Sequence, residues 1–308
     1  MRPLRNQCEV AVIGGGLAGL SAACHMARLG RLVTLFEASY MFGGLVATVD
    51  EVHGLGVPGK FSGQDLAVHL LDAARKAAVQ IVEAGVEKIE TAPQPRLRDA
   101  EGRDYKPEVI IVASGASLRK LGVPGEEEFL GRGVSRCATC DGGFFRGQDV
   151  VVTGSGDAAV EEALVLAKIC RRVIMVCRSP LKAKREYVDR IASRDNVTFI
   201  WDSQITEVLG EQGVTGVRVR DVKTGVQSVV ECTGLFPFIG VAPNTGFLPA
   251  ALLDRNGHVQ AGDDYRTAAP RVFAAGAVRK GYGGNIVQAM AEGIGAAEAA
   301  LRELENIS

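Results

Sequence analysis

The sequence contains few histidines, and its net charge is close to zero. Only four histidines occur among 308 residues, and no two of them have metal-ligand spacing, so no metal site is expected. The formal net charge of -1 indicates neither a nucleic-acid binder nor a polybasic membrane protein. Prolines number only eleven against 38 glycines, and 47% of the residues are hydrophobic, a fraction too high for a disordered chain. The composition predicts a globular protein of about two domains.

A signal peptide and a membrane span are also missing from the pattern. Residues 1–7 lead directly into the strand-like CEVAVIG at 8–14, which leaves no room for the long apolar core of a signal peptide. Residues 234–253 carry no charge and are long enough to span a bilayer. Three prolines and three glycines interrupt them, so they predict a strand, a loop and a short turn of helix. We expect a cytoplasmic protein without a membrane span.

An internal repeat organises the chain. VAVIGGGLAG at 10–19 and VVVTGSGDAA at 150–159 align at an offset of 140 residues. In each copy a β-branched run enters a glycine turn and then a helical stretch rich in alanine and leucine. Such glycines let the backbone approach a pyrophosphate at the N-terminus of the helix. Two nucleotide-binding βαβ units are predicted, with turns formed by Gly14, Gly16 and Gly19 and by Gly154, Gly156 and Ala159.

The two units differ at the position that reads the ribose. In the first, Glu37 ends the strand RLVTLFE, where a carboxylate can accept hydrogen bonds from a ribose diol without a 2'-phosphate, as in FAD or NAD. The same offset in the second unit leads to Cys177, followed by Arg178. That unit lacks the ribose acid, and one arginine favours a phosphate there.

Four further segments have recognisable patterns. Residues 109–117 and 271–278 predict buried strands that end in small residues, and residues 64–79 have helical apolar spacing with His69 at the edge of the amphipathic face. The basic cluster LKAKRE at 181–186 is more typical of a solvated helix face than of a partner site.

The motif CATCD at 137–141 carries the clearest chemistry. A zinc site needs a second pair of ligands, which the sequence does not offer, and seven cysteines in a large chain without a secretion signal indicate reduced thiols rather than structural disulfides. The spacing of Cys137 and Cys140 suits a reversible redox disulfide. Asp141 is either the proton donor for the thiolate released from that disulfide or the N-cap of a helix.

These residues carry a family resemblance that covers essentially the whole chain. The stretch at 113–167, which contains GRGVSRCATCDGGFF, resembles the centre of low-molecular-weight thioredoxin reductases, and GGGLAGLSAA, FSGQDL, GLFPFIGVAPNT and VFAAG occur in the family's order. The resemblance implies an α/β fold of two Rossmann-like, three-layer ββα domains, the second inserted in the first. Residues 1–116 and 243–308 would bind FAD, and residues 117–242 would form the pyridine-nucleotide domain that carries the dithiol.

The same resemblance implies roles for the site residues. Electrons in the family run from NADPH to FAD, to the disulfide and to thioredoxin, and the inserted domain rotates between these steps. Members of the family form homodimers, so a homodimer is expected here. By that pattern Cys140 meets the flavin, Cys137 attacks the protein substrate, and Asp141 is the acid and base. Four further residues are expected to bind the flavin: Gly44, Gly115, Gly276 and Ala277.

The sequence departs from the family at both nucleotides. Where the family reads the 2'-phosphate with a His-Arg-Arg run and a further arginine, this chain has Cys177, Arg178, Ser179 and Ala183. Where the family has Gly-Asp against the ribityl chain, it has Gly276 and Ala277, and the family's Arg-Gln-Ala is replaced by residues 284–286. We expect FAD to bind in an altered setting.

The electron partner therefore stays open at this point. NADPH remains possible if Arg178, with Lys182, Lys184 or Arg185, meets its phosphate. The alternatives are a ferredoxin or a second FAD in the inserted domain, as in relatives that do not use pyridine nucleotide. The partner that receives or supplies the thiols is expected to be a thioredoxin-like protein disulfide. A function of another class, a flavin redox sensor without turnover, would not need both sulfurs and a carboxylate.

Overall fold

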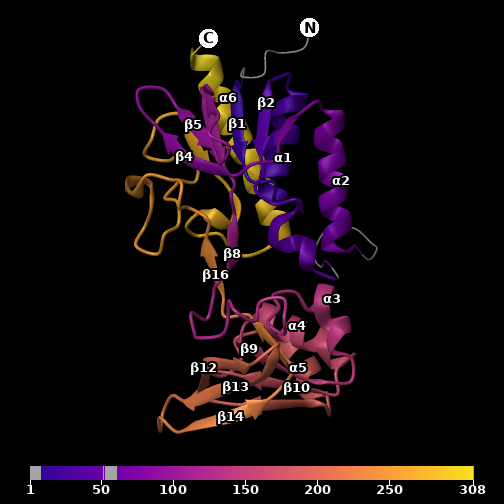
Figure 1. Cartoon of the computed structure of the whole chain (residues 1–308). Coiled ribbons are helices and arrows are strands. Elements are labelled where there is room, and N and C mark those ends of the chain that lie inside the picture. The colour runs from indigo at the N-terminus through magenta and orange to yellow at the C-terminus, as the bar shows by residue number, and fades with distance from the viewer. Residues whose placement is uncertain (1–7, 51, 53–60, 308) are drawn as a thin grey trace. The chain divides into compact units, whose positions relative to one another are not determined.

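The computed structural model describes residues 8–50, 52 and 61–307. By internal contacts the chain divides into two compact units, which we name the first unit (residues 1–117 and 243–308) and the second unit (residues 118–242) (Figure 1). Residues 1–7, from which the absence of a signal peptide was predicted, lie outside the described part.

A parallel sheet forms the middle layer of the first unit. Its strand order is β17-β7-β1-β2-β3, and every neighbouring pair is parallel. All residues of β1, β2 and β7 are buried, as expected for short apolar strands that are covered on both faces. The strands are β1 (Val10–Ile13), β2 (Val33–Phe36), β3 (Gln80–Val82), β7 (Val109–Val112) and β17 (Val272–Ala274).

Helices cover one face of this sheet and antiparallel strands cover the other. Successive residues of β1 alternate between two cores: Val10 and Val12 pack with the helices, whereas Ala11 and Ile13 pack in the core that contains residues of the antiparallel strands. This alternation follows from the two-residue period of a strand. The outer layers are α1 (Leu17–Arg28), α2 (Gly63–Lys76) and α6 (Ile286–Ile307) on one face, and β4 (Val86–Glu90), β5 (Arg96–Asp99) and β6 (Asp104–Tyr105) on the other.

The second unit repeats this arrangement around a parallel sheet of order β11-β10-β9-β15. Its alternate residues again divide between two cores: Val150 and Val152 pack with the helices, and Val151 packs with the antiparallel strands. The central strands are β9 (Asp149–Thr153), β10 (Arg172–Val176), β11 (Val197–Ile200) and β15 (Gly234–Pro237). The outer elements are α3 (Ala138–Asp141), α4 (Asp157–Ala167), α5 (Arg185–Ala192), β12 (Ser203–Gly210), β13 (Val214–Asp221) and β14 (Gln227–Glu231).

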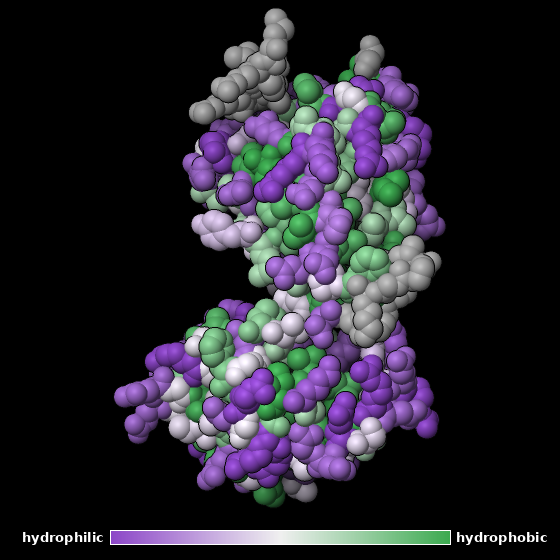
Figure 2. Space-filling model, turned by 90° about the vertical axis from the view of Figure 1, so that its right-hand side faces the viewer, coloured by the Kyte–Doolittle hydropathy of each residue, from purple (hydrophilic) through white to green (hydrophobic). Residues whose placement is uncertain are grey.

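Two short strands, β8 (Ala116–Leu118) and β16 (Val241–Pro243), pair where the chain passes between the units. The remaining elements are short 3-10 turns: η1 (Gly44–Thr48), η2 (Gly142–Phe145), η3 (Ala250–Leu252) and η4 (Gly276–Val278). On the face drawn in Figure 2, hydrophilic and hydrophobic residues are interspersed over each unit.

The predicted α/β fold is confirmed: each unit is a three-layer, Rossmann-type arrangement of helices, parallel sheet and antiparallel sheet. The uncharged run 234–253 forms β15, β16 and η3, as its prolines and glycines predict. Within the described residues no helix has the length and apolar character needed to cross a membrane. The helix predicted at 64–79 is α2, and His69 on it is exposed.

Candidate functional site

The first glycine turn connects β1 to α1 in the first unit. Gly14 has φ +110, and a Cβ there would lie 2.3 Å from the carbonyl oxygen of Ala113, while a Cβ on Gly19 would lie 1.8 Å from that of Gly14. Only glycine fits at these two positions. At Gly16, the N-cap of α1, a Cβ would meet nothing nearer than an oxygen of Gly43 at 4.0 Å. The open space at this helix N-terminus fits a pyrophosphate.

Glu37 lies against this turn, as its position after β2 predicts. Its Oε2 accepts a hydrogen bond from the backbone N–H of Gly15 at 2.5 Å, and its Oε1 accepts one from that of Ser39 at 2.7 Å. These bonds fix a carboxylate beside the space over Gly16. The donor set and the space together fit the adenosine half of FAD.

The expected flavin-side residues gather at the carboxyl edge of the same sheet. Gly44 lies near Gly16, since a Cβ added to Gly44 would be 3.7 Å from the Cα of Gly16. Gly115 follows β7, and its carbonyl accepts the N–H of Asn244 at 3.0 Å. Gly276 follows β17 at φ +75, and a Cβ there would be 2.9 Å from the Cβ of Ala18.

Position 277 has no carboxylate, and a buried carboxylate from α6 serves the neighbouring backbone instead. Glu292 is 3% exposed, and its Oε2 accepts the N–H of Gly276 at 2.8 Å. Arg279 pairs with it at 3.1 Å, and Gln288 donates to it at 2.8 Å. The Glu292–Arg279 ion pair therefore holds the 276–278 turn against α6. The sequence pattern did not predict this pair, because only the fold brings α6 next to the turn.

The second glycine turn connects β9 to α4. Gly154 has φ +137, and a Cβ there would lie 2.1 Å from the carbonyl oxygen of Phe238. Ala159 is fully buried in the helix core. At Gly156, the N-cap of α4, an added Cβ would meet nothing within 4 Å. This turn therefore also leaves space for a pyrophosphate at a helix N-terminus.

The residues after β10 differ sharply from Glu37. Cys177 is fully buried, its thiol donates to the carbonyl oxygen of Gly154 at 3.3 Å, and burial raises its pKa to about 11. It is a neutral group that faces inward and offers no acceptor to a ribose. Arg178, next in sequence, is exposed, and Ser179 lies 3.4 Å from Ser155, Oγ to Oγ.

The basic cluster 181–186 is mostly a loop, so the expectation of a helix face is wrong for residues 181–184. Helix α5 begins only at Arg185, because Lys184 uses its N–H to bond Asp157 Oδ1 at 2.8 Å. Lys182 ties the loop to the glycine turn by donating its N–H to Ser155 O at 2.7 Å.

Two of the four candidate phosphate ligands are already engaged. Arg185 is paired with Asp189 at 2.8 Å, and the Lys184 ammonium lies 3.8 Å from Asp157. Within the described part of the chain, no ion pair is found for the side chains of Arg178 and Lys182. Of the four candidates, these two cations are the ones available to meet a phosphate.

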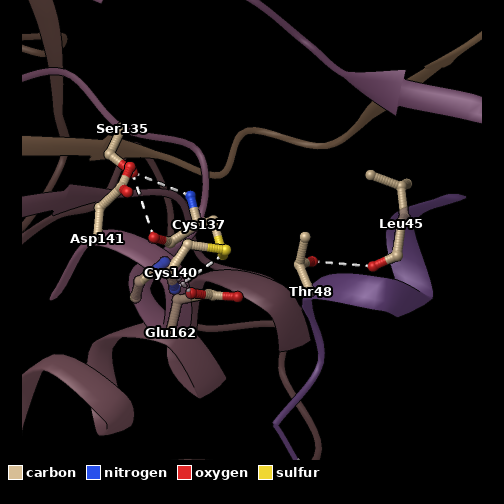
Figure 3. The surroundings of a disulfide bond; sticks show 8 residues. Leu45, Thr48, Ser135, Cys137, Cys140, Asp141 and Glu162 are labelled. Atoms are coloured by element: carbon tan, nitrogen blue, oxygen red, sulfur yellow. Dashed lines mark hydrogen bonds between the residues drawn. A yellow bond between two sulfur atoms is a disulfide. The ribbon is translucent and has the colours of Figure 1, made fainter. Parts of the chain in front are cut away.

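The dithiol forms the start of the short helix α3. Cys137 and Cys140 are joined by a disulfide with Cα atoms 5.3 Å apart (Figure 3). Cys137 is the N-cap of α3, and its Sγ accepts the backbone N–H of Cys140 at 3.0 Å. A hydrogen bond to this sulfur favours the thiolate once the disulfide opens.

Ser135 connects the dithiol to the carboxylate. Its hydroxyl donates to Asp141 Oδ2 at 2.7 Å and accepts the N–H of Cys137 at 3.1 Å (Figure 3). Asp141 stands at the N-cap position of η2, but its side chain makes no capping bond there and bonds Ser135 instead. From α4, Glu162 accepts the N–H of Ala138 at 2.7 Å. Ser135 and Glu162 were not foreseen, since neither has a motif of its own.

The other cysteines are separate from this chemistry. All five are buried and free: Cys8, Cys24, Cys170, Cys177 and Cys232. Among the residues that the structure describes, no group of three or more His, Cys, Asp or Glu side chains could hold a metal ion.

Two Rossmann-type units, one of them carrying a CxxC disulfide beside a serine that bonds both the Cys137 N–H and a carboxylate, together with the family match, define an FAD-dependent disulfide oxidoreductase. Residues 8–293 match the family described as pyridine nucleotide-disulphide oxidoreductase. The chain belongs to this family and, within it, to the low-molecular-weight thioredoxin reductases, as relatives and solved structures of matching length show.

The similarity extends over nearly the full chain. The thioredoxin reductase of Treponema pallidum is 37% identical over 306 residues, which is 99% of each chain. That of Listeria monocytogenes is 34% identical over 302 residues, 97% of this chain and 94% of the relative. The structure is similar to Lactococcus lactis thioredoxin reductase in the FR conformation, with a TM-score of 0.92, 32% identity, and coverage of 97% of this chain and 100% of the other.

Proposed function

We propose that this enzyme transfers electrons between FAD in the first unit and the Cys137–Cys140 disulfide, and onward to a thioredoxin-like protein disulfide. The observation that carries the proposal is the disulfide whose flanking carboxylate is held by Ser135. We assign residues 1–116 and 243–308 to FAD, and residues 117–242 to the dithiol and a second nucleotide. The names of the relatives, thioredoxin reductases, support the protein substrate.

The first unit offers the groups that would hold FAD. Gly14, Gly16 and Gly19 would receive the pyrophosphate, and Glu37 the adenosine ribose. On the flavin side we assign backbone contacts to Gly44, Gly115 and Gly276, with Ala277 giving no side-chain bond. When bound, FAD supplies the electron pair that reduces a disulfide.

The dithiol then acts by thiol-disulfide exchange. Reduction of the disulfide takes two electrons and yields a thiolate on Cys137 and a sulfur on Cys140 that takes up a proton. The Cys137 thiolate attacks the partner disulfide, one partner sulfur leaves, and a mixed disulfide forms. Cys140 then attacks Cys137, which reforms the Cys137–Cys140 bond and releases the partner as a dithiol. We assign to Asp141 the delivery and recovery of the protons on the leaving sulfurs.

For the electron donor we favour NADPH bound with a weak preference over NADH. The support is the open turn formed by Gly154, Gly156 and Ala159, and the available cations of Arg178 and Lys182. A hydrogen bond to a charged group contributes roughly 1.5 to 3 kcal/mol. With Cys177, Ser179 and Ala183 at the positions of the family's phosphate ligands, at least two cationic contacts are missing, which weakens NADPH by on the order of a hundredfold or more.

A second FAD in the inserted unit is the alternative that one observation favours. The turn at Gly156 is open, while Cys177 and Ser179 offer no cation to a 2'-phosphate. Under that alternative the donor is a ferredoxin or another flavin system rather than a pyridine nucleotide. A homodimer and a cytoplasmic location stay predictions.

The test is a flavin count followed by anaerobic reduction. We expect one FAD per chain, bleached by NADPH, with turnover of a thioredoxin disulfide that is abolished in Cys140→Ser while FAD stays bound. Two flavins per chain that NADPH does not bleach would establish the diflavin alternative. Retention of full activity in Cys140→Ser would overturn the redox role of the dithiol, and bound flavin without any disulfide turnover in the wild type would indicate a sensor.

A further inference from the structure

The two units have the same strand register beyond their glycine turns. In the first unit, Glu37 at the end of β2 donates its N–H to Val82 O on β3 at 3.0 Å. In the second, Cys177 at the end of β10 donates its N–H to Ile200 O on β11 at 2.9 Å. The residue after Ile200 is Trp201. The repeat therefore places Trp201 immediately beside the position that reads the ribose, at the carboxyl edge of the sheet.

Trp201 is the only tryptophan of the chain, and it is presented as a supported, exposed ring. Its indole stacks on Phe199 with ring centroids 4.8 Å apart and an interplanar angle of 4°. Phe199 packs in turn against the core beneath α4 and α5. Although it is stacked in this way, Trp201 is 45% exposed. Trp201 is therefore an exposed aromatic ring that Phe199 holds in place at the carboxyl edge of the sheet.

The strand order relates this ring to a bound nucleotide. Neighbouring strands lie about 4.8 Å apart, so the end of β11 is about 10 Å from the end of β9. In a Rossmann unit the pyrophosphate lies at the turn after the first strand, and the adenosine ribose lies at the end of the second. The base attached to that ribose points onward, toward the third strand. In the second unit these strands are β9, β10 and β11, so the base arrives at Trp201.

We propose that Trp201, backed by Phe199, is the stacking platform for the adenine of the dinucleotide bound by the second unit. This inference rests on the proposed function, in that the second unit takes an adenine dinucleotide. Stacking on the base would replace recognition lost at the ribose, where Cys177 offers no carboxylate. It makes no distinction between NADP, NAD and FAD, because all three share the adenosine diphosphate group.

Substitutions of Trp201 and of Arg178, the candidate phosphate ligand, should weaken the binding of different dinucleotides. Base stacking on an aromatic side chain corresponds to about a 5- to 150-fold change in affinity. Trp201→Ala should weaken every adenine dinucleotide by such a factor, and Trp201→Phe, which keeps a ring, should weaken them much less. Arg178→Ala should weaken NADP but leave NAD nearly unchanged.

The experiment is calorimetric titration of the FAD-loaded, oxidised protein with NADP+, NAD+ and FAD, with nicotinamide mononucleotide and FMN as probes that lack adenine. Melting temperature and flavin content of each variant separate lost binding from lost folding. If the wild type is purified with a second flavin, the readout is its retention, which Trp201→Ala should reduce. The dinucleotides that the wild type binds identify the occupant, a nicotinamide dinucleotide or a second flavin, and Trp201→Ala should bind each of them more weakly.

Three outcomes contradict the inference, each in a different way. If the wild type binds the dinucleotides and Trp201→Ala binds them equally well, Trp201 is not the platform while the proposed nucleotide function stands. If the wild type binds none of them, both the platform and the nucleotide function of the second unit are wrong. An equal loss on the probes without adenine would also overturn the platform, because it would indicate a general distortion of the unit.

Discussion

Replacing Ser135 by alanine tests how the carboxylate is coupled to the dithiol. The change removes the hydrogen bond from Ser135 to Asp141 at 2.7 Å and leaves the N–H of Cys137 without its acceptor at 3.1 Å. A bond to a charged group contributes roughly 1.5 to 3 kcal/mol, which corresponds to about a 10- to 150-fold change in rate if it is needed only in the reacting geometry. The orphaned N–H should also cost about 1 to 3 kcal/mol of stability.

The assay isolates the exchange step from the identity of the electron donor. The protein is reduced anaerobically with dithionite, mixed with an oxidised thioredoxin and quenched with an alkylating agent at intervals. The exchange rate of Ser135→Ala should fall by about 10- to 150-fold, with FAD still bound. Ser193→Ala is the matched control, because Ser193 is exposed at the end of α5 and its hydroxyl, among the described residues, donates only to the carbonyl of Arg190.

A double substitution separates coupling from general damage. If Ser135 acts by orienting Asp141, adding Ser135→Ala to Asp141→Asn should slow exchange only slightly further, because their shared bond is already altered. A full additional loss in the double variant would show that Ser135 acts independently of the carboxylate. A wild-type exchange rate in Ser135→Ala would refute the coupling altogether.

The remaining predictions concern the cofactors and the buried thiols. Heat should release FAD rather than FMN, and Glu37→Gln should raise the FAD dissociation constant about tenfold or more, measured by equilibrium dialysis; an unchanged constant would remove Glu37 from the site. Arg178→Ala and Lys182→Ala should each remove most of the weak preference for NADPH over NADH in stopped-flow reduction, by slowing reduction with NADPH alone, whereas Arg185→Ala, whose side chain is already paired, should not. Burial raises the pKa of Cys8, Cys170 and Cys177 to about 11 and that of Cys232 to about 12. At pH 8 a thiol of pKa about 11 is present as the thiolate at roughly one part in a thousand. Native oxidised protein should therefore resist alkylation at pH 8, and reduction should expose only the dithiol, as peptide mass spectrometry would show; labelling should rise only as the pH approaches these values.

The fold was predictable because its signals are local. A glycine turn between a β-branched run and a helical stretch is written in consecutive residues, and Gly14 and Gly154 both adopt the positive φ that only glycine takes easily. The offset of 140 residues also leads from Glu37 to the equivalent strand end at Cys177, since strand, helix and strand have nearly equal lengths in the two units.

The rest of the site depends on contacts that only folding creates. Glu162 reaches Ala138 across 24 residues, and it does so because α4 packs on α3. Trp201 lies beside Cys177 through the parallel register of β10 and β11, which no spacing in the sequence reports. The loop at 181–184 looked helical by composition, but its bonds to Asp157 and Ser155 hold it to the glycine turn instead.

The paired crossings between the units have a consequence for how such a chain can be cut and rejoined. In the first unit, Asn244 donates its N–H to Gly115 O at 3.0 Å, and in the second, Arg119 donates its N–H to Gly240 O at 2.9 Å. Each unit thus brings its own two cut ends within one hydrogen bond of each other. A short turn could close the first unit without the insert, and the insert has adjacent termini like an independent domain. The enzyme is in this sense modular: the second unit could be exchanged for another dinucleotide-binding domain at one insertion point, without a change in the backbone of the first unit.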